Sequence, residues 1–378
     1  MEDVSVAIRL NPFKGLDGPT GTPVPWSPYG RILESRPQFI LDPLMHAGCY
    51  YVQDSSAMFV GHVFRKALDR FGPGLRVLDL CAAPGGKTTD IAASLRERFG
   101  GAFTLVANEV MKARAATLCD NVAVWGDPAV AVTSVDPAVI GRAMPGCFDI
   151  IVADVPCSGE GMFRKDPRAV EEWSPELVTV CAARQKRILA DVWPALREGG
   201  VLVYSTCTYE DAENDANLRW AAEELGGSII APDDEFPQYG VRLTDCGSLL
   251  RAGEVPGEGQ WAGALIKTAP AAAARSFDLA ALRPLRNGTP APVLKGRDLI
   301  PHPDSVLAID FDKSSMPMAE VDLRTALQYL HRDSIVLPDA PAGYVAVCYK
   351  GHPLGLVKNL GKRCNNLHPM SRRILKDI

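Results

Sequence analysis

The sequence predicts an α/β protein whose central part forms a doubly wound parallel sheet. Short apolar runs alternate with helix-like stretches from about residue 75 to about residue 225. This order is typical of parallel strands joined by helices that cover both faces of a sheet. A glycine-rich turn follows the first apolar run, and a cysteine follows each of the last two, at Cys157 and Cys207. Both features fall at carboxyl ends of strands, where such sheets bind ligands.

The elements follow from apolar periodicity and from start and stop signals. Phe148–Ala153 is almost entirely apolar, which predicts a central strand covered on both faces. Ser174-Pro175-Glu176 predicts a helix start, because it combines an N-cap serine, a proline at the first helical position and an acid in the first turn. Gly199-Gly200 is expected to end that helix. In chain order, the expected elements are the strand Arg76–Leu80, a helix from about Thr88 to Phe99, the strand Thr104–Asn108, a helix through Leu118 and Val124, the strands Val130–Thr133 and Phe148–Ala153, a helix from Ser174 to Leu196 and Arg197, the strand Val201–Ser205, and a helix from about Asp211 to Leu225.

Composition divides the chain into four parts. Residues 1–72 form a lead that is rich in proline and glycine at its start, and residues 73–268 hold the predicted sheet. Residues 269–297 are rich in alanine and proline and are interpreted as a linker. Residues 298–378 are expected to form a second domain, with strand-like pieces at Tyr344–Tyr349 and Leu354–Val357.

The overall composition predicts a globular cytoplasmic protein. The 378 residues, 47% of them hydrophobic, can bury a large core. No apolar run approaches the length of a membrane span, and Met1-Glu2-Asp3-Val4 does not start a signal peptide. The ten cysteines are therefore expected to be reduced thiols, and neither they nor the six histidines have the spacing of a metal site. We expect no membrane and no metal, and take a monomer as the default.

Charge is informative only locally. The net charge of -5 gives no sign of a nucleic-acid partner, but the end of the chain carries many bases against the single acid Asp377. Such a tail is often only a solvated surface; contact with nucleic-acid phosphates is the second interpretation. The bases are Lys350, Lys358, Lys362, Arg363, Arg372, Arg373 and Lys376.

The two cysteines fit the chemistry of cytosine methylation. They lie in Asp154-Val155-Pro156-Cys157 and Ser205-Thr206-Cys207. Cytosine C5 is a poor nucleophile, so its methylation requires that a nucleophile such as a thiolate first adds to C6. A second cysteine can assist the breakdown of that adduct. A lone cysteine at a strand end is more often a small apolar residue, but two at matching ends beside a cofactor-type loop favour catalysis.

The turn from Asp79 to Thr88 (DLCAAPGGKT) is expected to bind a cofactor, because its small residues let a ligand approach the backbone and a helix N-terminus follows. A Walker A loop would need glycine where Cys81 stands, and the Gly-x-Gly-x-x-Gly fingerprint of dinucleotide binding is absent. The third interpretation is an S-adenosylmethionine loop. Glu109, which ends the second strand, supports it because a carboxylate there can accept both ribose hydroxyls, and Asp136 is placed to meet the adenine edge. Each acid, taken alone, is as well explained as a loop or helix cap.

In combination, the motifs resemble those of the Nol/Nop/Sun RNA cytosine-C5 methyltransferases. They are CAAPGGKT (81–88), ANE (107–109), ADVPCSGEGMFRKDP (153–167) and YSTCTY (204–209), and the resemblance covers roughly Ile8 to Ile230. It implies a Rossmann-like core that depends on S-adenosylmethionine, preceded by an RNA-binding lead. The tail resembles the PUA-like α+β RNA-binding domain of bacterial ribosomal RNA methyltransferase F relatives. The pieces that carry this second resemblance are Tyr329-Leu330, Cys348-Tyr349-Lys350-Gly351, Pro353-Leu354-Gly355 and Asn365-Asn366.

The resemblance also implies roles for individual residues. Cys207 would attack C6, and Cys157 would help to resolve the adduct and release the product. Asp154 would lie near the methyl donor and the target base, with Lys87 near the same junction. The loop backbone would hold the methionine part of the cofactor, Glu109 its ribose and Asp136 its adenine. The loop residues in question are Cys81, Ala82, Ala83, Pro84, Gly85 and Gly86.

Arginines and a lysine in the loop after Cys157 are candidates for phosphate contacts, although an exposed charged loop explains them equally well. They are Arg164, Lys165 and Arg168. Relatives usually carry a longer lead before the stretch Arg9-Leu10-Asn11-Pro12. We therefore expect a lead that is short of a strand or two, with consequences for RNA docking rather than for the chemistry.

The predicted function is S-adenosylmethionine-dependent methylation of cytosine C5 in RNA, with ribosomal RNA favoured by the tail. Transfer RNA is the alternative substrate. A DNA cytosine methyltransferase would attack with the Pro-Cys cysteine itself, and the additional Thr206-Cys207 argues against it. A non-catalytic RNA-binding assembly factor is a further alternative, opposed by the intact cysteines and cofactor loop. A P-loop nucleotidase is the most distant.

Overall fold

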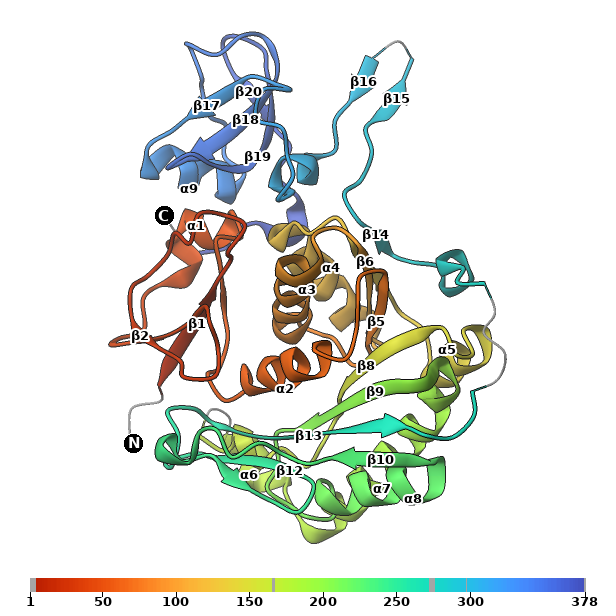
Figure 1. The fold of residues 1–378 in the computed structure, drawn as a ribbon. Helices are drawn as coiled ribbons and strands as arrows, with labels where there is room; N and C mark the ends of the chain where they lie inside the picture. Colours follow the sequence, from red (N-terminus) through yellow and green to blue (C-terminus); the bar gives the residue numbers. More distant parts are fainter. Residues whose placement is uncertain (1–4, 165–166, 272–275, 297, 377–378) are drawn as a thin grey trace.

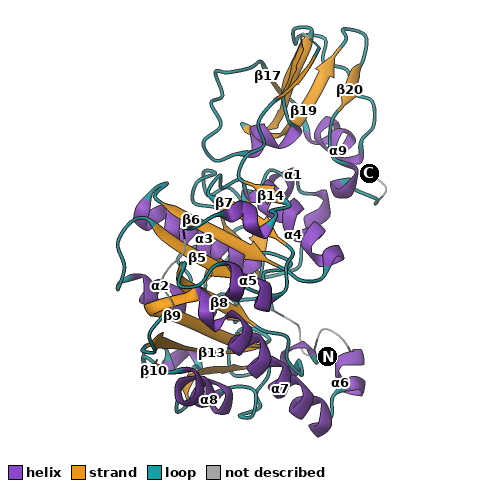
Figure 2. Cartoon of the chain, turned by 90° about the vertical axis from the view of Figure 1, so that its right-hand side faces the viewer, coloured by secondary structure: helices purple, strands orange, loops and turns teal. Residues whose placement is uncertain are grey.

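The computed structural model describes residues 5–164, 167–271, 276–296 and 298–376 (Figure 1). A small antiparallel sheet comes first along the chain, a large sheet forms the middle, and a second small sheet forms the tail. The tail lies beyond one end of the large sheet (Figure 2). Lys165, one of the predicted phosphate contacts, lies outside the described residues.

The large sheet is built around parallel strands in the spatial order β9-β8-β5-β6-β7. From β5 the chain proceeds through β6 and β7 toward one edge and then returns to fill β8 and β9 on the other side. The order therefore reverses between β5 and β8, and such a reversal creates a crevice for ligands outside the strand ends. The predicted doubly wound sheet is confirmed. Its parallel strands are β5 (Leu75–Asp79), β6 (Phe103–Asn108), β7 (Val130–Thr133), β8 (Phe148–Asp154) and β9 (Leu196–Thr206).

Helices cover both faces of this sheet because successive side chains of each strand point to opposite sides. In β5, Val77 belongs to a buried cluster that also contains Ile91 and Leu118. Leu78 belongs to a second cluster, which contains Ile140 and Leu189. Val77 and Leu78 are both fully buried. The helices are α2 (Phe59–Leu68), α3 (Gly86–Phe99), α4 (Lys112–Trp125), α5 (Pro137–Ala143), α6 (Pro167–Glu172), α7 (Pro175–Val192) and α8 (Asp215–Leu225).

The predicted end of the long helix α7 was wrong. The helix stops at Val192, a 3-10 turn (η3, Trp193–Ala195) follows, and β9 already begins at Leu196. Pro194 explains the early stop, because proline lacks the N–H that would continue the helical hydrogen bonds. Leu196 instead pairs with Phe148 at the start of β8. The cap at Ser174 is as expected, since its hydroxyl accepts a hydrogen bond from Leu177 N at 3.1 Å.

Antiparallel strands that the sequence did not suggest widen the sheet at both edges. β13 pairs with β9, and β12 and β10 pair with β13. On the opposite edge, β14 from the Ala/Pro-rich stretch pairs with β7. Residues interpreted as linker therefore contribute a short strand. The added strands are β10 (Gly227–Ile230), β11 (Arg242–Leu243), β12 (Gly247–Arg251), β13 (Gly259–Lys267) and β14 (Arg286–Asn287). A two-stranded hairpin, β15 (Val293–Lys295) and β16 (Asp298–Ile300), projects from the body (Figure 1).

The first sheet and the tail share one hydrophobic core, although they lie at opposite ends of the chain. Ile8 and Tyr50 from the lead pack in the same buried cluster as Tyr329 and Val345 from the tail. The lead has the strand order β2-β3-β1-β4, and the tail β17-β18-β19-β20. Their elements are β1 (Val6–Leu10), β2 (Thr22–Pro23), β3 (Gly30–Leu33), α1 (Pro43–His46) and β4 (Tyr50–Val52) in the lead, and β17 (Met318–Glu320), α9 (Leu323–His331), β18 (Gly343–Tyr349), β19 (His352–Asn359) and β20 (Cys364–Asn366) in the tail.

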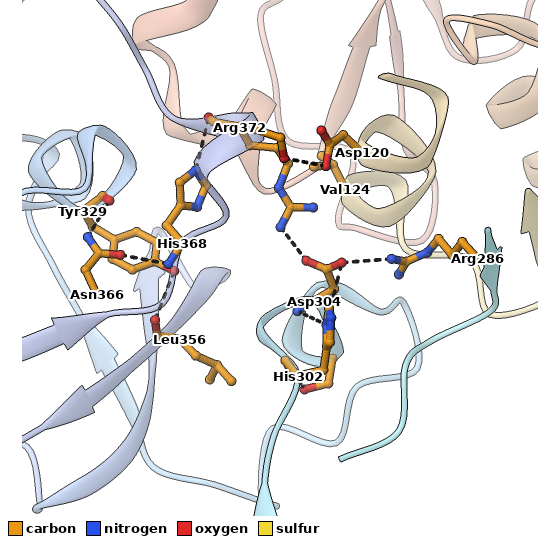
Figure 3. Close-up of polar contacts among 12 residues, drawn as sticks. Asp120, Val124, Arg286, His302, Asp304, Tyr329, Leu356, Asn366, His368 and Arg372 are labelled. Atoms are coloured by element: carbon orange, nitrogen blue, oxygen red, sulfur yellow. Dashed lines mark hydrogen bonds and ion pairs between the residues drawn. The ribbon is translucent and has the colours of Figure 1, made fainter. Parts of the chain in front are cut away.

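A buried carboxylate, Asp304, joins the tail to the large sheet (Figure 3). Its Oδ2 accepts a hydrogen bond from Arg286 Nη1 of β14 at 2.9 Å, and its Oδ1 accepts one from Arg372 near the end of the chain. Close by, Ser371 Oγ donates to Asp120 Oδ1 of α4 at 3.1 Å. Arg372, one of the bases considered for phosphate contact, therefore pairs with an acid of the protein and is only partly exposed.

The C-terminal end of α4 is a second joint between the three parts. The carbonyl of Val124 accepts from Lys14 Nζ at 2.8 Å, and that of Trp125 accepts from Asn11 Nδ2 at 3.2 Å. The carbonyl of Gly126 accepts from Ile309 N at 2.9 Å. The last carbonyls of a helix have no hydrogen-bond partner within the helix, so here donors from the lead and from the tail segment satisfy them.

Among the described residues, no helix has both the length and the apolar composition needed to cross a membrane.

Candidate active site

The predicted site residues converge at the carboxyl ends of β5, β8 and β9, beside the reversal of strand order. β5 ends at Asp79 and leads into the glycine-rich loop, while β8 ends at Asp154 and β9 at Thr206. Asp154 stands directly opposite Ser205 in the β8–β9 ladder. Cys157 comes three residues after the end of β8, and Cys207 directly follows the end of β9.

The two cysteines touch through their sulfur atoms. Cys157 Sγ lies 3.1 Å from Cys207 Sγ and also accepts a hydrogen bond from Cys207 N at 3.3 Å. All ten cysteines of the chain are free thiols. The separation suits a shared proton, so one sulfur can be a thiolate while the other remains a thiol.

The surroundings of the pair decide which sulfur ionises. The hydrogen bond from Cys157 lowers the pKa of Cys207, burial acts against this shift, and the nearby Lys87 supports it. The same hydrogen bond, together with burial, raises the pKa of Cys157 well above the value of an ordinary thiol. Because the thiolate is the nucleophilic form, the geometry favours Cys207 as nucleophile and Cys157 as the protonated partner.

Asp154 is held by donors from three directions. Lys87 Nζ lies 2.8 Å from its Oδ2, Ser205 Oγ donates to its Oδ1 at 2.7 Å, and Gln260 Nε2 donates to Oδ1 at 3.3 Å. Burial acts to lower the pKa of Lys87, but the adjacent Asp154 outweighs it and raises that pKa. The site therefore holds a partly buried ammonium–carboxylate pair next to the cysteines.

The glycine-rich loop is fixed by its carbonyl groups. Arg114 Nη2 donates to Ala83 O at 2.7 Å, Asn121 Nδ2 donates to Pro84 O at 2.7 Å, and Arg9 Nη2 donates to Gly86 O at 3.1 Å. Gly85 has a φ of 117°, which only glycine adopts readily. The N-cap of α3 is Gly85, which has no side chain to cap the first turn, so N–H groups of that turn can face an anionic ligand group.

Glu109 and Asp79 add two buried carboxylates beside this loop. Glu109 Oε1 accepts from Met111 N at 2.9 Å, and its Oε2 lies 3.2 Å from Arg114 Nη1. Asp79 Oδ2 accepts from Thr88 Oγ1 at 2.6 Å, whereas its buried Oδ1 has no hydrogen-bond partner among the described residues. Burial raises the pKa of Asp79 to about 7. Unpartnered acceptors and free N–H groups around a glycine turn fit S-adenosylmethionine, which carries positive groups, ribose hydroxyls and a carboxylate.

Asp136 lies at the expected place, past the end of β7, but the structure gives it a capping contact. Its exposed side chain accepts from Ala138 N at 2.8 Å and starts helix α5. Contact with an adenine edge stays a prediction for this residue. Arg164 Nε lies 3.8 Å from Glu258 Oε2, so this candidate phosphate contact already faces an acid of the protein.

Sequence reasoning missed several buried polar residues that support the cysteines. Glu160 lay within the quoted motif, but nothing in the sequence indicated its contacts with the Cys207 turn. Gln185 and Glu213 hold the Cys157 turn through Pro156 O and Ser158 N. Gln260 lies on β13, a strand that its glycines and alanines made hard to predict from apolar periodicity.

Within the described residues, no group of histidine, cysteine and acidic side chains is arranged to hold a metal ion.

The fold and the site together resemble those of methyltransferases of the doubly wound α/β class. Residues 71–224 match the family model described as 16S rRNA methyltransferase RsmB/F, and residues 318–374 match the model described as Methyltransferase RsmF PUA domain. Two separate parts of the chain are therefore similar to this RsmB/F group, the first over the large sheet and the second over the tail.

Curated relatives agree with the family models. The chain is 39% identical over 256 residues to Ribosomal RNA small subunit methyltransferase F of Salmonella paratyphi C, and 38% identical over the same length to the protein of that name from Escherichia coli O139:H28. Each match covers 65% of this chain and 52% of the relative. The chain thus spans about half the length of the curated relatives it matches.

Solved structures share the fold. A methyltransferase homolog protein from Pyrococcus horikoshii superimposes with a TM-score of 0.58 and 25% identity, covering 70% of this chain and 87% of that one. NSun6 from the same organism gives a TM-score of 0.51 and 24% identity, covering 64% of this chain and 58% of that one, which supports the fold alone.

Proposed function

We propose that this protein methylates C5 of a cytosine in ribosomal RNA of the small subunit, with S-adenosylmethionine as methyl donor and Cys207 as covalent nucleophile. The observation that carries the proposal is the sulfur pair: two thiols 3.1 Å apart at matching strand ends, one with a lowered and one with a raised pKa. The choice of RNA is supported by the family and by the printed names of the curated relatives.

The residues divide the chemistry between them. The Cys207 thiolate adds to C6, which places electron density on C5. The bound donor supplies an electrophilic methyl group. Lys87 holds Asp154 beside the nucleophile, where the carboxylate can accept from the cytosine amino group. The target base must leave its stack to reach this crevice.

After methylation, the proton on C5 passes to solvent water, and the electron pair of the C5–H bond forms the C5=C6 double bond as the Cys207–C6 bond breaks. We assign Cys157 to this last stage, in which its thiol returns a proton to the departing Cys207 sulfur over the 3.1 Å contact. Cys207 can then leave as a protonated or rapidly reprotonated group, which favours release of the product.

We assign RNA docking to the PUA-type tail and to the lead, with the methyltransferase core between them. In this proposal the boundaries between the lead, the core, the linker and the tail domain lie after residues 72, 268 and 297.

Transfer RNA remains the alternative substrate, and a non-catalytic assembly factor is the alternative class of function. The site opposes the assembly factor, because such a role does not require two thiols in contact beside a glycine-rich loop.

The first prediction is that Cys207→Ala loses methyl transfer by at least about 1,000-fold, because no other group supplies the addition to C6. Binding of S-adenosylmethionine is expected to stay within about 3-fold, since Cys207 lies outside the loop. Labelled methyl transfer into ribosomal RNA and into transfer RNA, followed by bisulfite sequencing, measures both activity and substrate. Full activity of this variant refutes the proposal; labelling of transfer RNA alone selects the alternative substrate.

A further inference from the structure

A short 3-10 turn three residues after Cys157 contacts the Cys207 turn at successive positions. This turn, η2 (Glu160–Met162), is separated from Cys207 by more than forty residues of chain. Glu160 Oε2 accepts hydrogen bonds from Tyr209 N at 2.7 Å and from Thr208 Oγ1 at 2.7 Å. Gly161 N donates to Cys207 O at 2.7 Å. Residues 207, 208 and 209 are therefore each held by this turn.

The close approach requires glycine at position 161. A Cβ atom there would lie 2.8 Å from Cys207 O and 3.1 Å from Gly259 O, both of them backbone atoms that cannot move aside cheaply. A side chain at this position would push η2 away from the Cys207 turn. The packing thus brings the Glu160 carboxylate within reach of both donors.

The Cys157 turn is anchored separately on its other side. Ser158 N donates to Glu213 Oε2 at 3.1 Å, and Gln185 Nε2 donates to Pro156 O at 2.9 Å. Ser158 Oγ and Thr208 Oγ1 lie 2.9 Å apart, so a hydroxyl contact also joins the two turns. Since Thr208 donates to Glu160, the carboxylate ends a hydrogen-bond chain that runs across both turns.

We propose that Glu160 is a positioning residue that locks the Cys207 turn onto the Cys157 turn and so holds the two sulfur atoms in contact. This inference rests on the proposed function for its role in turnover, but the geometry that it explains exists in the free protein. Glu160 acts through backbone and hydroxyl groups, and the reacting atoms are those of the cysteines. Its role requires an acceptor oxygen, and a negative charge is not needed.

The experiment compares Glu160→Ala with Glu160→Gln. The glutamine carbonyl can accept both hydrogen bonds, whereas alanine can accept neither. We expect Glu160→Ala to lower kcat about 100-fold, because misplacing a catalytic group by about 1 Å costs this much, with the dissociation constant for S-adenosylmethionine unchanged. Glu160→Gln is expected to recover at least about a third of the wild-type rate. Glu171→Ala, which removes an exposed acid of α6, is the matched control.

A second readout needs no RNA. Diamide oxidises two adjacent thiols to a disulfide, and its N=N bond takes up the two hydrogen atoms. Peptide mapping then follows the rate at which the Cys157–Cys207 bridge forms. We expect Glu160→Ala to slow bridging at least about 10-fold and Glu160→Gln to leave it near the wild-type rate, because bridging depends on the alignment of the sulfurs. Thr208→Val, which removes one of the two donors, should fall between them and serves if Glu160→Ala does not fold.

The outcomes separate the two proposals. Bridging that depends on Glu160 in a protein that methylates no RNA supports the positioning role and refutes the proposed function. Wild-type bridging and wild-type kcat in Glu160→Ala overturn the positioning role while methylation stands. A Glu160→Gln variant that bridges as slowly as Glu160→Ala also overturns it, because an acceptor oxygen would then be insufficient.

Discussion

At Cys207, the thiolate is stabilised by groups that come from distant parts of the chain. The Cys157 thiol approaches from the end of β8, and the Lys87 ammonium approaches from the first turn of α3. Lys87 is itself kept protonated by Asp154 at 2.8 Å. In the proposed mechanism, these groups favour the thiolate of Cys207 before any substrate binds.

This arrangement predicts that Lys87→Met raises the pKa of Cys207. The substitution removes a cation and leaves the Asp154 carboxylate unpaired near the sulfur, and both changes disfavour the thiolate. The pH midpoint for alkylation of Cys207 by iodoacetamide, followed by peptide mapping, should rise by about 1 pH unit. Lys66→Met, which removes a lysine of α2 that pairs with Asp233, is the control. An unchanged midpoint in Lys87→Met would show that Lys87 does not act on Cys207.

At the scale of elements, strands with continuous apolar runs were predictable, and so was the site at their ends. β5, β6, β7 and β8 lie within one or two residues of the predicted positions. Their periodicity is strong because both faces are buried. The loop and both cysteines follow from these strands, so much of the candidate site was visible before the fold was known.

The elements that were missed are those whose signals depend on distant partners. β13 contains two glycines and two alanines among its nine residues and becomes a strand because β9 and β12 flank it. Gln260 reaches Asp154 only through that pairing. The contacts of Glu160 are likewise set by packing of η2 on the Cys207 turn. Neighbours so far apart in sequence cannot be inferred from local propensity.

At the scale of the whole molecule, the lead, the core and the tail are tied together by buried contacts. The lead and tail share a core, and both also satisfy carbonyls at the end of α4. The start of α4 carries Arg114, which holds the cofactor loop at Ala83 O. One helix thus connects the cofactor loop with the joint of the other two parts.

The Asp304 junction predicts an acid-sensitive connection. Burial acts to raise the pKa of Asp304, but the guanidinium groups of Arg372 and Arg286 outweigh it and lower that pKa. A carboxylate with a depressed folded pKa stabilises the fold above its unfolded pKa of about 3.9, and this stabilisation is lost as the pH falls through the folded value. Asp304→Ala should lower the free energy of unfolding by about 3 kcal/mol at neutral pH, because two arginines lose a buried partner.

Urea denaturation at pH 7 and at about pH 3 measures this effect, and hydrogen exchange in residues 345–357 locates it. The destabilisation should shrink at the lower pH, where wild-type Asp304 also approaches protonation. An equal loss of stability at both values would contradict the role given to the charge of Asp304.

The most direct test of the account identifies which sulfur bonds to the substrate. Cys157→Ala protein is incubated with ribosomal RNA and S-adenosylmethionine, and the covalent protein–RNA species is digested and mapped by mass spectrometry. The account predicts an accumulated adduct whose cytosine is attached to the peptide that carries Cys207. Failure to form any adduct, or wild-type protein cross-linked through Cys157, would contradict it.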